Sequence, residues 1–387
     1  MKNAINRPVT SADYRLLAAR RLPLFLFNYI DGGANDERTM AANQADFQRY
    51  HLRQRVLRDV SQVDTRTVLS GQAASMPLAL APIGLAGMMA RRGEAQAARA
   101  AARAGVPFTL STVGICPLEE VQAAAAAPFW FQLYMVRDRE LEARLLRRAQ
   151  AAGVETLLFT VDLPVGGMRH RDWRSGMVGN SLYVKLAKAR QLATRPRWML
   201  DVGLRGKPHD FGNLREVMAD SRDLNAYKDF IGAQFDPSVN WKDIAWLRSL
   251  WPGRLLIKGV MDAEDARAAA GVGAEGVIVS NHGGRQLDSV SSTLLKLPEI
   301  VTAVGETIEV YLDGGVRSGI DVVKAVALGA RGVFIGRPWI WAIAARGESG
   351  LKDLLSVFQK EVATAMALMG VNRVSEITAE VLEPGRS

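Results

Sequence analysis

The sequence predicts an α/β fold in which short parallel strands alternate with helices. From Pro77 onward, short apolar runs are separated by longer stretches with Ala-rich or charged faces, such as 94–104, 139–152 and 263–270. The runs are apolar at consecutive positions, which is typical of strands buried on both faces of a parallel sheet. The predicted strands are Leu78–Ala81, Phe108–Ser111, Trp130–Tyr134, Leu157–Val161, Leu255–Gly259, Gly276–Ser280, Val310–Asp313 and Gly332–Ile335.

Eight strand–helix steps predict a (β/α)8 TIM barrel, with a doubly wound open sheet as the alternative. The chain has 387 residues, enough for one barrel of about 250 residues with additions. We therefore expect a single domain over 1–387, with the barrel at 76–345.

Three additions to the barrel are expected. Residues 1–75 are predicted to be a helical extension, with Ser11 and Asn35 as helix caps and a helix that begins after Pro23 and ends at Asp31. An insert of roughly 90 residues without a clear strand separates the fourth and fifth strands, and its core is placed at about 171–237. Residues 346–387 are predicted to form C-terminal helices and a tail.

The composition excludes several classes of protein. Hydrophobic residues make up 48% of the chain and charged residues 23%, as in globular proteins. Cys116 is the only cysteine, so no disulfide can form within the chain, and a reducing compartment is expected. No apolar stretch is long enough to span a bilayer, and Met1–Thr10 lacks the apolar core of a signal peptide. The net charge of +9 indicates an anionic partner, but no nucleic-acid-binding motif accompanies it, so nucleic acid is not expected.

Polar residues gather where the predicted strands end, which is where a TIM barrel places its active site. Glycines at Gly314, Gly315 and Gly336, followed by Arg317 and Arg337, predict a phosphate site after strands seven and eight. The other strand-end residues in this group are Ala81, Pro82, Gly84, Ser111, Gln132, Thr160, Lys258, Ser280 and Asp313.

A histidine and a carboxylate at two strand ends suggest acid–base chemistry. His282 is suited to proton transfer near neutral pH, and Asp162 is positioned to orient it. Arg285 and Arg169 can both grip a carboxylate, and Tyr134 and Tyr29 can donate hydrogen bonds to a small anion. Buried Lys258 requires an anion beside it. By contrast, 36–38 and 91–92 are interpreted as solvated surface, and no metal site is expected.

Ser280-Asn281-His282-Gly283-Gly284-Arg285-Gln286-Leu287-Asp288 resembles the signature of the FMN-dependent α-hydroxy-acid oxidase and dehydrogenase family. Further motifs in matching order extend the resemblance from Tyr14 to about Thr378. The resemblance implies FMN as cofactor, His282 as base and Asp162 as its partner. It also implies Arg169, Arg285, Tyr29 and Tyr134 as substrate contacts, and flavin or phosphate contacts at the remaining strand-end residues.

Within that family the chain is most similar to the bacterial respiratory L-lactate dehydrogenases, on motifs such as 88–94, 208–210 and 235–238. Mandelate dehydrogenases are the nearest alternative, because Gly166 and Val113 leave room for a side chain larger than methyl. An oxidase that uses O₂ is a further alternative, although family oxidases usually carry alanine at the position of Gly84. An FMN-dependent isomerase would need a diphosphate site instead of a carboxylate clamp, and a catalytically dead flavin-binding barrel should lack the base His282.

The expected partners are a small 2-hydroxy acid, a quinone or other respiratory acceptor, an anionic membrane surface and further copies of this chain. Between Arg171 and Lys207 there are nine basic and two acidic residues, with apolar residues such as Leu182, Leu186 and Trp198 between them. A basic, partly apolar segment of this kind suits an anionic bilayer. We therefore expect a peripheral protein at the cytoplasmic face of the inner membrane. A solvated lid over the active site is the alternative.

Overall fold

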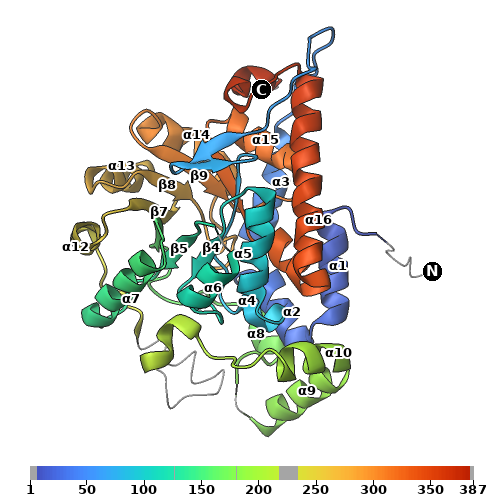
Figure 1. Ribbon diagram of the computed structural model, residues 1–387, viewed down its shortest axis with the longest axis vertical. Coiled ribbons are helices and arrows are strands. Elements are labelled where there is room, and N and C mark those ends of the chain that lie inside the picture. Colours follow the sequence, from blue (N-terminus) through green and yellow to red (C-terminus); the bar gives the residue numbers. More distant parts are fainter. Residues whose placement is uncertain (1–6, 126, 180, 218–233, 384–387) are drawn as a thin grey trace.

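The computed structural model describes residues 7–125, 127–179, 181–217 and 234–383. Its centre is an eight-stranded parallel sheet (Figure 1). The strands are β3 (Leu78–Leu80), β4 (Thr109–Ser111), β5 (Trp130–Leu133), β6 (Thr156–Thr160), β7 (Arg254–Val260), β8 (Gly276–Val279), β9 (Glu309–Asp313) and β10 (Gly332–Ile335).

The sheet closes into a barrel. The strand order is β3-β10-β9-β8-β7-β6-β5-β4, and a parallel bridge between Leu80 and Phe108 joins the two ends. The strands are buried on both faces, and the interior is filled by side chains such as Leu158, Leu256 and Ile278. All eight predicted strands are confirmed, and the open-sheet alternative is wrong.

Helices follow the strands and pack outside the barrel, each burying one face. They are α4 (Ala86–Met89), α5 (Gly93–Ala104), α6 (Leu118–Ala125), α7 (Arg139–Ala151), α12 (Trp241–Leu250), α13 (Ala263–Gly271), α14 (Thr293–Val304), α15 (Gly319–Ala327) and α16 (Arg337–Met369). Helix α16 contains a kink at Gly347, so its second part begins close to residue 346, where the C-terminal helices were predicted to start. The short helices η4 (Val374–Glu376) and η5 (Ala379–Val381) follow it.

The N-terminal extension is helical at first and ends in a hairpin. Its helices are α1 (Ser11–Arg21), α2 (Leu24–Asp31), α3 (Arg38–Ala45) and η1 (Asp46–Arg49), and its strands are β1 (Thr67–Leu69) and β2 (Gln72–Ala74). The prediction of helices alone was therefore wrong. The two turn residues, Ser70 and Gly71, both have positive φ, as a tight hairpin turn requires.

Two of the predicted helix caps also differ from the structure. Thr10, and not Ser11, caps α1, since its hydroxyl accepts a hydrogen bond from the N–H of Asp13. Glu37, and not Asn35, precedes α3. The Ser11 hydroxyl instead donates to the carbonyl oxygen of Arg317 at 2.6 Å, which ties the extension to a strand-end loop.

The insert between β6 and β7 forms small helices on one side of the barrel, at the bottom of Figure 1. They are α8 (His170–Arg174), α9 (Leu182–Ala193), α10 (Pro196–Trp198), η2 (Met199–Leu204) and η3 (Gly212–Val217). Part of the predicted insert, residues 180 and 218–233, lies outside the described residues. In the described ranges, no helix combines the length and hydropathy needed to cross a membrane.

Specific contacts dock the insert onto the rest of the chain. The indole N–H of Trp198 donates to the carbonyl oxygen of Met88 at 2.9 Å, and Trp198 is only 4% exposed. The N–H of Phe25 donates to the side chain of Gln191, and Arg195 donates to the carbonyl oxygen of Leu22. Trp198 therefore anchors the insert to the protein, and its predicted place on a membrane-facing surface is wrong.

Candidate active site

A cavity of about 570 Å³ opens at the carboxyl ends of the barrel strands. The polypeptide surrounds it with loops from the barrel, the N-terminal extension and the insert. Most residues that we predicted from the sequence line this cavity: Tyr29, Ala81, Pro82, Gly84, Tyr134, Arg169, Lys258, His282, Arg285, Asp313, Gly314, Gly315, Arg317, Gly336 and Arg337. The structure thus brings together side chains that are up to about 300 residues apart in the sequence, as a barrel does with its strand ends.

His282 and Asp162 form a hydrogen-bonded pair beside the cavity. The Nδ1 atom of His282 is 2.8 Å from Oδ1 of Asp162. With Nδ1 as the donor in this bond, the neutral imidazole keeps Nε2 as a proton acceptor. The His282 backbone has a φ of 56°, and its N–H donates to the Ser280 hydroxyl at 3.1 Å. The strained turn therefore holds the ring where one nitrogen is bound and the other is available.

Burial and charge set the protonation of this pair. Burial lowers the pKa of His282 below its ordinary value, and Asp162 only partly opposes this. Burial also disfavours the ionised form of Asp162, but the charges of His282 and Lys258 outweigh burial and lower the pKa of Asp162. A neutral imidazole beside an ionised carboxylate is the state in which His282 can accept a proton at neutral pH.

Five arginines line the cavity and give it a strong positive charge. Arg285 donates to the carbonyl oxygen of Gly32 at 2.7 Å, and Arg337 donates to those of Asp31, Gly32 and Gly283. Burial, followed by repulsion from neighbouring arginines, lowers the pKa of both Arg285 and Arg337 to about 9. Since they remain protonated at neutral pH, these buried cations favour anionic ligands.

Arg317 and Arg169 lie on either side of that pair, and Arg137, which the sequence reasoning missed, also lines the cavity. Burial lowers the pKa of Arg317 to about 10, and its guanidinium lies 5.3 Å from the centre of the Trp341 ring. Arg169 donates to the carbonyl oxygen of Arg285 at 3.4 Å, and it is 4.0 Å from the Asp172 carboxylate. Arg169 and Arg285 are therefore neighbours in the cavity.

Lys258 is held by two buried partners. Its ammonium is 3.0 Å from the Asp313 carboxylate and donates to the Ser280 hydroxyl at 2.9 Å. Burial disfavours the charged form of Lys258, but Asp313 and Asp162 outweigh burial and raise its pKa. Ser280 does not line the cavity. Its hydroxyl instead holds both Lys258 and the N–H of His282, which makes it a support for two cavity residues.

Ser111, Gln132 and Thr160 lie on adjacent strands behind the cavity wall. The Ser111 hydroxyl donates to Oε1 of Gln132 at 3.0 Å. Within the described part of the chain, Nε2 of Gln132, Oγ1 of Thr160 and Oδ1 of Asp313 are buried and have no hydrogen-bond partner. Buried polar atoms without partners are costly, so a ligand with donors and acceptors along one edge would stabilise this row. The pyrimidine edge of a flavin has that pattern of donors and acceptors.

Two different structural features explain why glycine occupies these positions around the cavity. Gly314 and Gly315 both have a φ of 87°, and a Cβ at Gly315 would lie 1.8 Å from the carbonyl oxygen of Asn43. Packing against α3, in addition to ligand access, therefore requires glycine there. A Cβ on Gly336 would meet only the Cβ of Ala81, at 3.9 Å, so this glycine keeps open space beside Arg337.

The two predicted tyrosines, Tyr29 and Tyr134, both line the cavity. The Tyr29 ring lies 5.3 Å from the Arg285 guanidinium, and a Cβ on Gly84 would lie 3.5 Å from the Tyr29 hydroxyl. Tyr134 packs on Phe235, with ring centres 4.8 Å apart. Burial and then the Asp162 charge raise the pKa of Tyr134, so its hydroxyl remains a proton donor. Both hydroxyls can thus hydrogen-bond to an anion.

The insert supplies cavity residues that sequence reasoning missed. Trp173, Met177 and Phe211 line the cavity, together with Phe235 and Pro237 at the end of the insert. In the sequence these residues lie in a long stretch without periodic strands, so no local pattern indicated which would face inward. The interpretation of Glu37 and Arg92 as solvated surface was wrong, because Glu37 pairs with Arg171 and Arg92 pairs with Glu120.

The chain is similar to known proteins over nearly its whole length. The chain is 54% identical over 374 residues to the L-lactate dehydrogenase of Caulobacter sp. (strain K31), covering 96% of this chain and 98% of the relative. It is 55% identical to the L-lactate dehydrogenase of Caulobacter vibrioides (strain NA1000 / CB15N), covering 96% of this chain and 97% of the relative.

Solved structures with the same fold include a monotopic membrane protein, (S)-mandelate dehydrogenase. Its TM-score is 0.91 at 36% identity, covering 98% of this chain and 100% of that one. A mandelate oxidase with (S)-4-hydroxymandelic acid has a TM-score of 0.84 at 36% identity, covering 97% and 98%. The family model described as FMN-dependent dehydrogenase matches residues 18–384. The chain therefore belongs to the FMN-dependent dehydrogenase family.

Proposed function

We propose that this protein oxidises L-lactate to pyruvate with FMN and passes the electrons to a membrane quinone. The observation that carries the proposal is the His282–Asp162 pair at 2.8 Å, beside a cavity lined by Arg169 and Arg285. A base next to a carboxylate clamp suits a substrate whose carboxylate and hydroxyl are on adjacent carbons. The relatives with more than 50% identity are L-lactate dehydrogenases, which supports this substrate class.

The residues around the cavity fit FMN. Arg317 and Arg337, with the backbone of Gly314, Gly315 and Gly336, would hold the phosphate. The buried row of Ser111, Gln132 and Thr160, with Lys258, would hold the ring, because Nε2 of Gln132 and Oγ1 of Thr160 are buried without a partner among the described residues. FMN held by these residues would supply a two-electron acceptor for the oxidation at C2 of the substrate.

The protein residues bind the substrate and move its proton. Arg285 and Arg169 would hold the carboxylate through charge-assisted hydrogen bonds. Nε2 of His282 accepts the substrate proton, and ionised Asp162 stabilises the imidazolium that results. Tyr29 and Tyr134 donate hydrogen bonds, and the Lys258 cation favours negative charge at the cofactor edge. These groups are held in place before the reaction, so little reorganisation is needed.

A larger substrate such as L-mandelate is the second candidate. A Cβ on Gly166 would have no neighbour within 4 Å, and Val113 also lines the cavity. Both features leave space beyond a methyl group. The solved mandelate dehydrogenase and mandelate oxidase structures share this fold, which favours testing this substrate directly.

The cavity rim supports a lipophilic acceptor. Val165, Met168 and Trp173 line the cavity and are each more than half exposed. An apolar rim of this kind suits the ring of a quinone more than a charged acceptor. If the acceptor is O₂, the apolar rim does not bind an acceptor ring.

The proposed membrane contact uses the outer side of the insert. Helix α9 has no buried residue, and Leu182 and Tyr183 are 73% and 81% exposed. Leu186 is also exposed on this helix, which carries Lys185 and Arg190 as well. We therefore propose peripheral binding to the anionic, cytoplasmic face of the inner membrane. The protein would bind there as a homo-oligomer, which size-exclusion chromatography with light scattering can measure.

The experiment that tests substrate and acceptor separates the two half-reactions. Purified FMN-loaded protein is mixed anaerobically with L- and D-lactate and L- and D-mandelate while flavin absorbance is followed. The reduced protein is then mixed with air-saturated buffer or with a quinone. We expect fastest bleaching with L-lactate and faster reoxidation by quinone. Faster bleaching by L-mandelate would favour the second candidate, and rapid stoichiometric peroxide would indicate an oxidase.

A further inference from the structure

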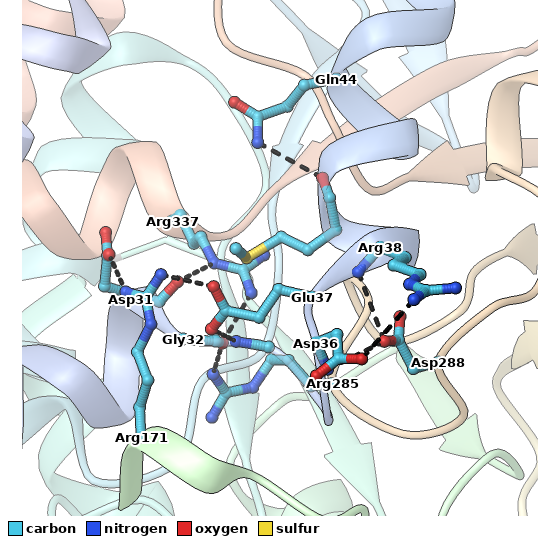
Figure 2. A network of polar contacts seen from close by, with 12 residues as sticks. Asp31, Gly32, Asp36, Glu37, Arg38, Gln44, Arg171, Arg285, Asp288 and Arg337 are labelled. Carbon is cyan, nitrogen blue, oxygen red and sulfur yellow. Dashed lines mark hydrogen bonds and ion pairs between the residues drawn. The ribbon is translucent and has the colours of Figure 1, made fainter. Parts of the chain in front are cut away.

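The turn formed by Asp31, Gly32 and Gly33, between α2 and α3, holds two cavity arginines through its backbone (Figure 2). The carbonyl oxygen of Asp31 accepts from Nε of Arg337 at 3.1 Å. The carbonyl oxygen of Gly32 accepts from Arg337 at 2.9 Å and from Arg285 at 2.7 Å. A displacement of this turn would therefore displace the arginines on both the substrate side and the phosphate side.

The side chains of the same turn point to a different pair of cations. Asp31 accepts from Arg15 at 2.6 and 2.7 Å and from Arg171 at 2.8 Å, and its side chain is only 2% exposed. The second amino group of Arg171 pairs with Glu37, whose other oxygen accepts from the N–H of Gly33 at 2.8 Å. Arg171 thus bridges two carboxylates, one on each side of the turn.

In this arrangement the acidic side chains of the turn pair with arginines outside the cavity, and the arginines that line the cavity remain available for a ligand. The carboxylates of Asp31 and Glu37 pair with Arg15 and Arg171, which do not line the cavity. Arg285, by contrast, donates a hydrogen bond to an uncharged acceptor in the turn, the carbonyl oxygen of Gly32. A carboxylate on Arg285 would compete with the substrate carboxylate, whereas a carbonyl orients the guanidinium without cancelling its charge.

Arg171 also fixes the position of a third cavity arginine. It lies in α8, directly after the helix start, and Arg169 is the N-cap residue of that helix. The N–H of Asn35 donates to the carbonyl oxygen of Met168 at 2.7 Å, so the chain just before Arg169 is tied to the extension too. Two links, one ionic and one through the backbone, therefore join the segment of Arg169 to the turn that holds Arg285.

We propose that Arg171, through Asp31 and Glu37, is a positioning residue that sets the spacing of Arg169 and Arg285 for a carboxylate ligand. This inference rests on the proposed function, because it assumes that these two arginines bind the substrate carboxylate. Arg171 itself does not line the cavity, so any effect of its removal must pass through the residues that do.

The test measures anion binding without turnover. FMN-loaded Arg171→Gln protein is titrated with oxalate, a dicarboxylate that cannot undergo the reaction, and the flavin spectrum reports binding. Arg174→Gln is the matched control, because Arg174 is exposed in the same helix and its replacement changes the net charge equally. We expect the dissociation constant to rise about tenfold in Arg171→Gln, a typical coupling within one network, and less than about twofold in Arg174→Gln. FMN content should stay equal in both.

A second measurement distinguishes positioning from general loosening. In an Arg169→Ala background, Arg171→Gln should weaken oxalate binding far less than it does in the parent protein, since the residue that it positions is gone. Fully additive effects would overturn the proposal, as would equal affinities for Arg171→Gln and Arg174→Gln.

Glu37→Gln provides an independent variant in case Arg171→Gln fails to hold FMN. It removes one of the two carboxylate partners of Arg171 while keeping an acceptor for the N–H of Gly33. We expect the oxalate dissociation constant to rise about threefold, less than in Arg171→Gln, because only one of the two ion pairs of Arg171 is lost. An unchanged constant would overturn the proposal. If L-lactate fails to bleach the wild-type flavin while oxalate behaves as expected, the proposed function fails and the positioning role stands.

Discussion

The barrel strand ends and the insert that borders them differ in how they hold their residues. Every residue of β5 and β6 is buried, and Gln132 of β5 accepts a hydrogen bond from Ser111 on the neighbouring strand. In the insert, α9 has no buried residue, and a few side chains, such as Trp198 and Gln191, dock the segment. The buried strand ends therefore suit chemistry that depends on precise distances. The exposed face of the insert suits contact with other molecules.

This difference shows why the insert has two kinds of apolar residue. Trp198 is buried and satisfies its indole N–H within the protein, whereas Leu182 and Tyr183 face outward. Sequence composition alone does not separate these roles. Substitutions in the two regions should therefore have effects of different kind as well as different size.

The largest effect is expected at the strand ends. His282→Gln should slow bleaching of the flavin by L-lactate by ~10²–10⁴-fold, because His282 is the only histidine among the described residues that line the cavity. Anaerobic stopped-flow absorbance measures this, and the released cofactor, quantified by its spectrum, should remain FMN at wild-type occupancy. Near-normal bleaching in the variant would show that His282 has only a structural role.

The next largest effect should distinguish a buried residue of the insert from an exposed one by their contributions to stability. Trp198→Ala should lower the free energy of unfolding by about 3–5 kcal/mol, as truncation of a buried tryptophan does, and thermal unfolding with bound FMN measures the loss. Leu200→Ala, at an exposed position close by, is the control and should change the melting temperature little. Equal melting temperatures for the two variants would mean that the Trp198 contact does not hold the insert.

The exposed face of α9 should affect membrane binding and leave catalysis unchanged. Replacing Leu182, Tyr183 and Leu186 together with serine removes apolar groups worth roughly 1.5–3 kcal/mol each when fully buried, and less at an interface. Co-sedimentation with anionic liposomes should fall at least tenfold, while bleaching by L-lactate stays at the wild-type rate. If the wild-type protein does not sediment with liposomes at low salt, the lid interpretation of the insert is favoured.

The smallest effect is a shift in pH dependence. Because burial lowers the pKa of His282 below its ordinary value of 6.5, the neutral base should persist below that pH. The plot of kcat/KM against pH should therefore reach half its plateau below pH 6.5 and stay level up to neutral pH. Asp162→Asn removes a charge that raises this pKa, so its midpoint should be lower still. A midpoint above 6.5 in the wild type would contradict this assignment of the base.

The sequence by itself determined the barrel and most of its site. Consecutive apolar residues are a local signal, and parallel strands that are buried on both faces must show it. Since all strand ends of a closed barrel meet at one side, residues such as Asp162, Lys258 and His282 could be placed together before their distances were known. The packing that turns Trp198 inward and brings Trp173 and Phe211 to the cavity was decided by the tertiary structure alone.

The tertiary structure alone also decided which residues hold the cavity side chains from behind. Ser280 holds Lys258 and His282 without reaching the cavity. The carbonyl oxygen of Asp31 accepts from Arg337, and its carboxylate pairs with Arg171. No sequence pattern marks a backbone carbonyl as the partner of a distant arginine. These contacts join segments that are far apart in the chain, so they depend on how whole elements pack, which the local pattern of residues does not contain.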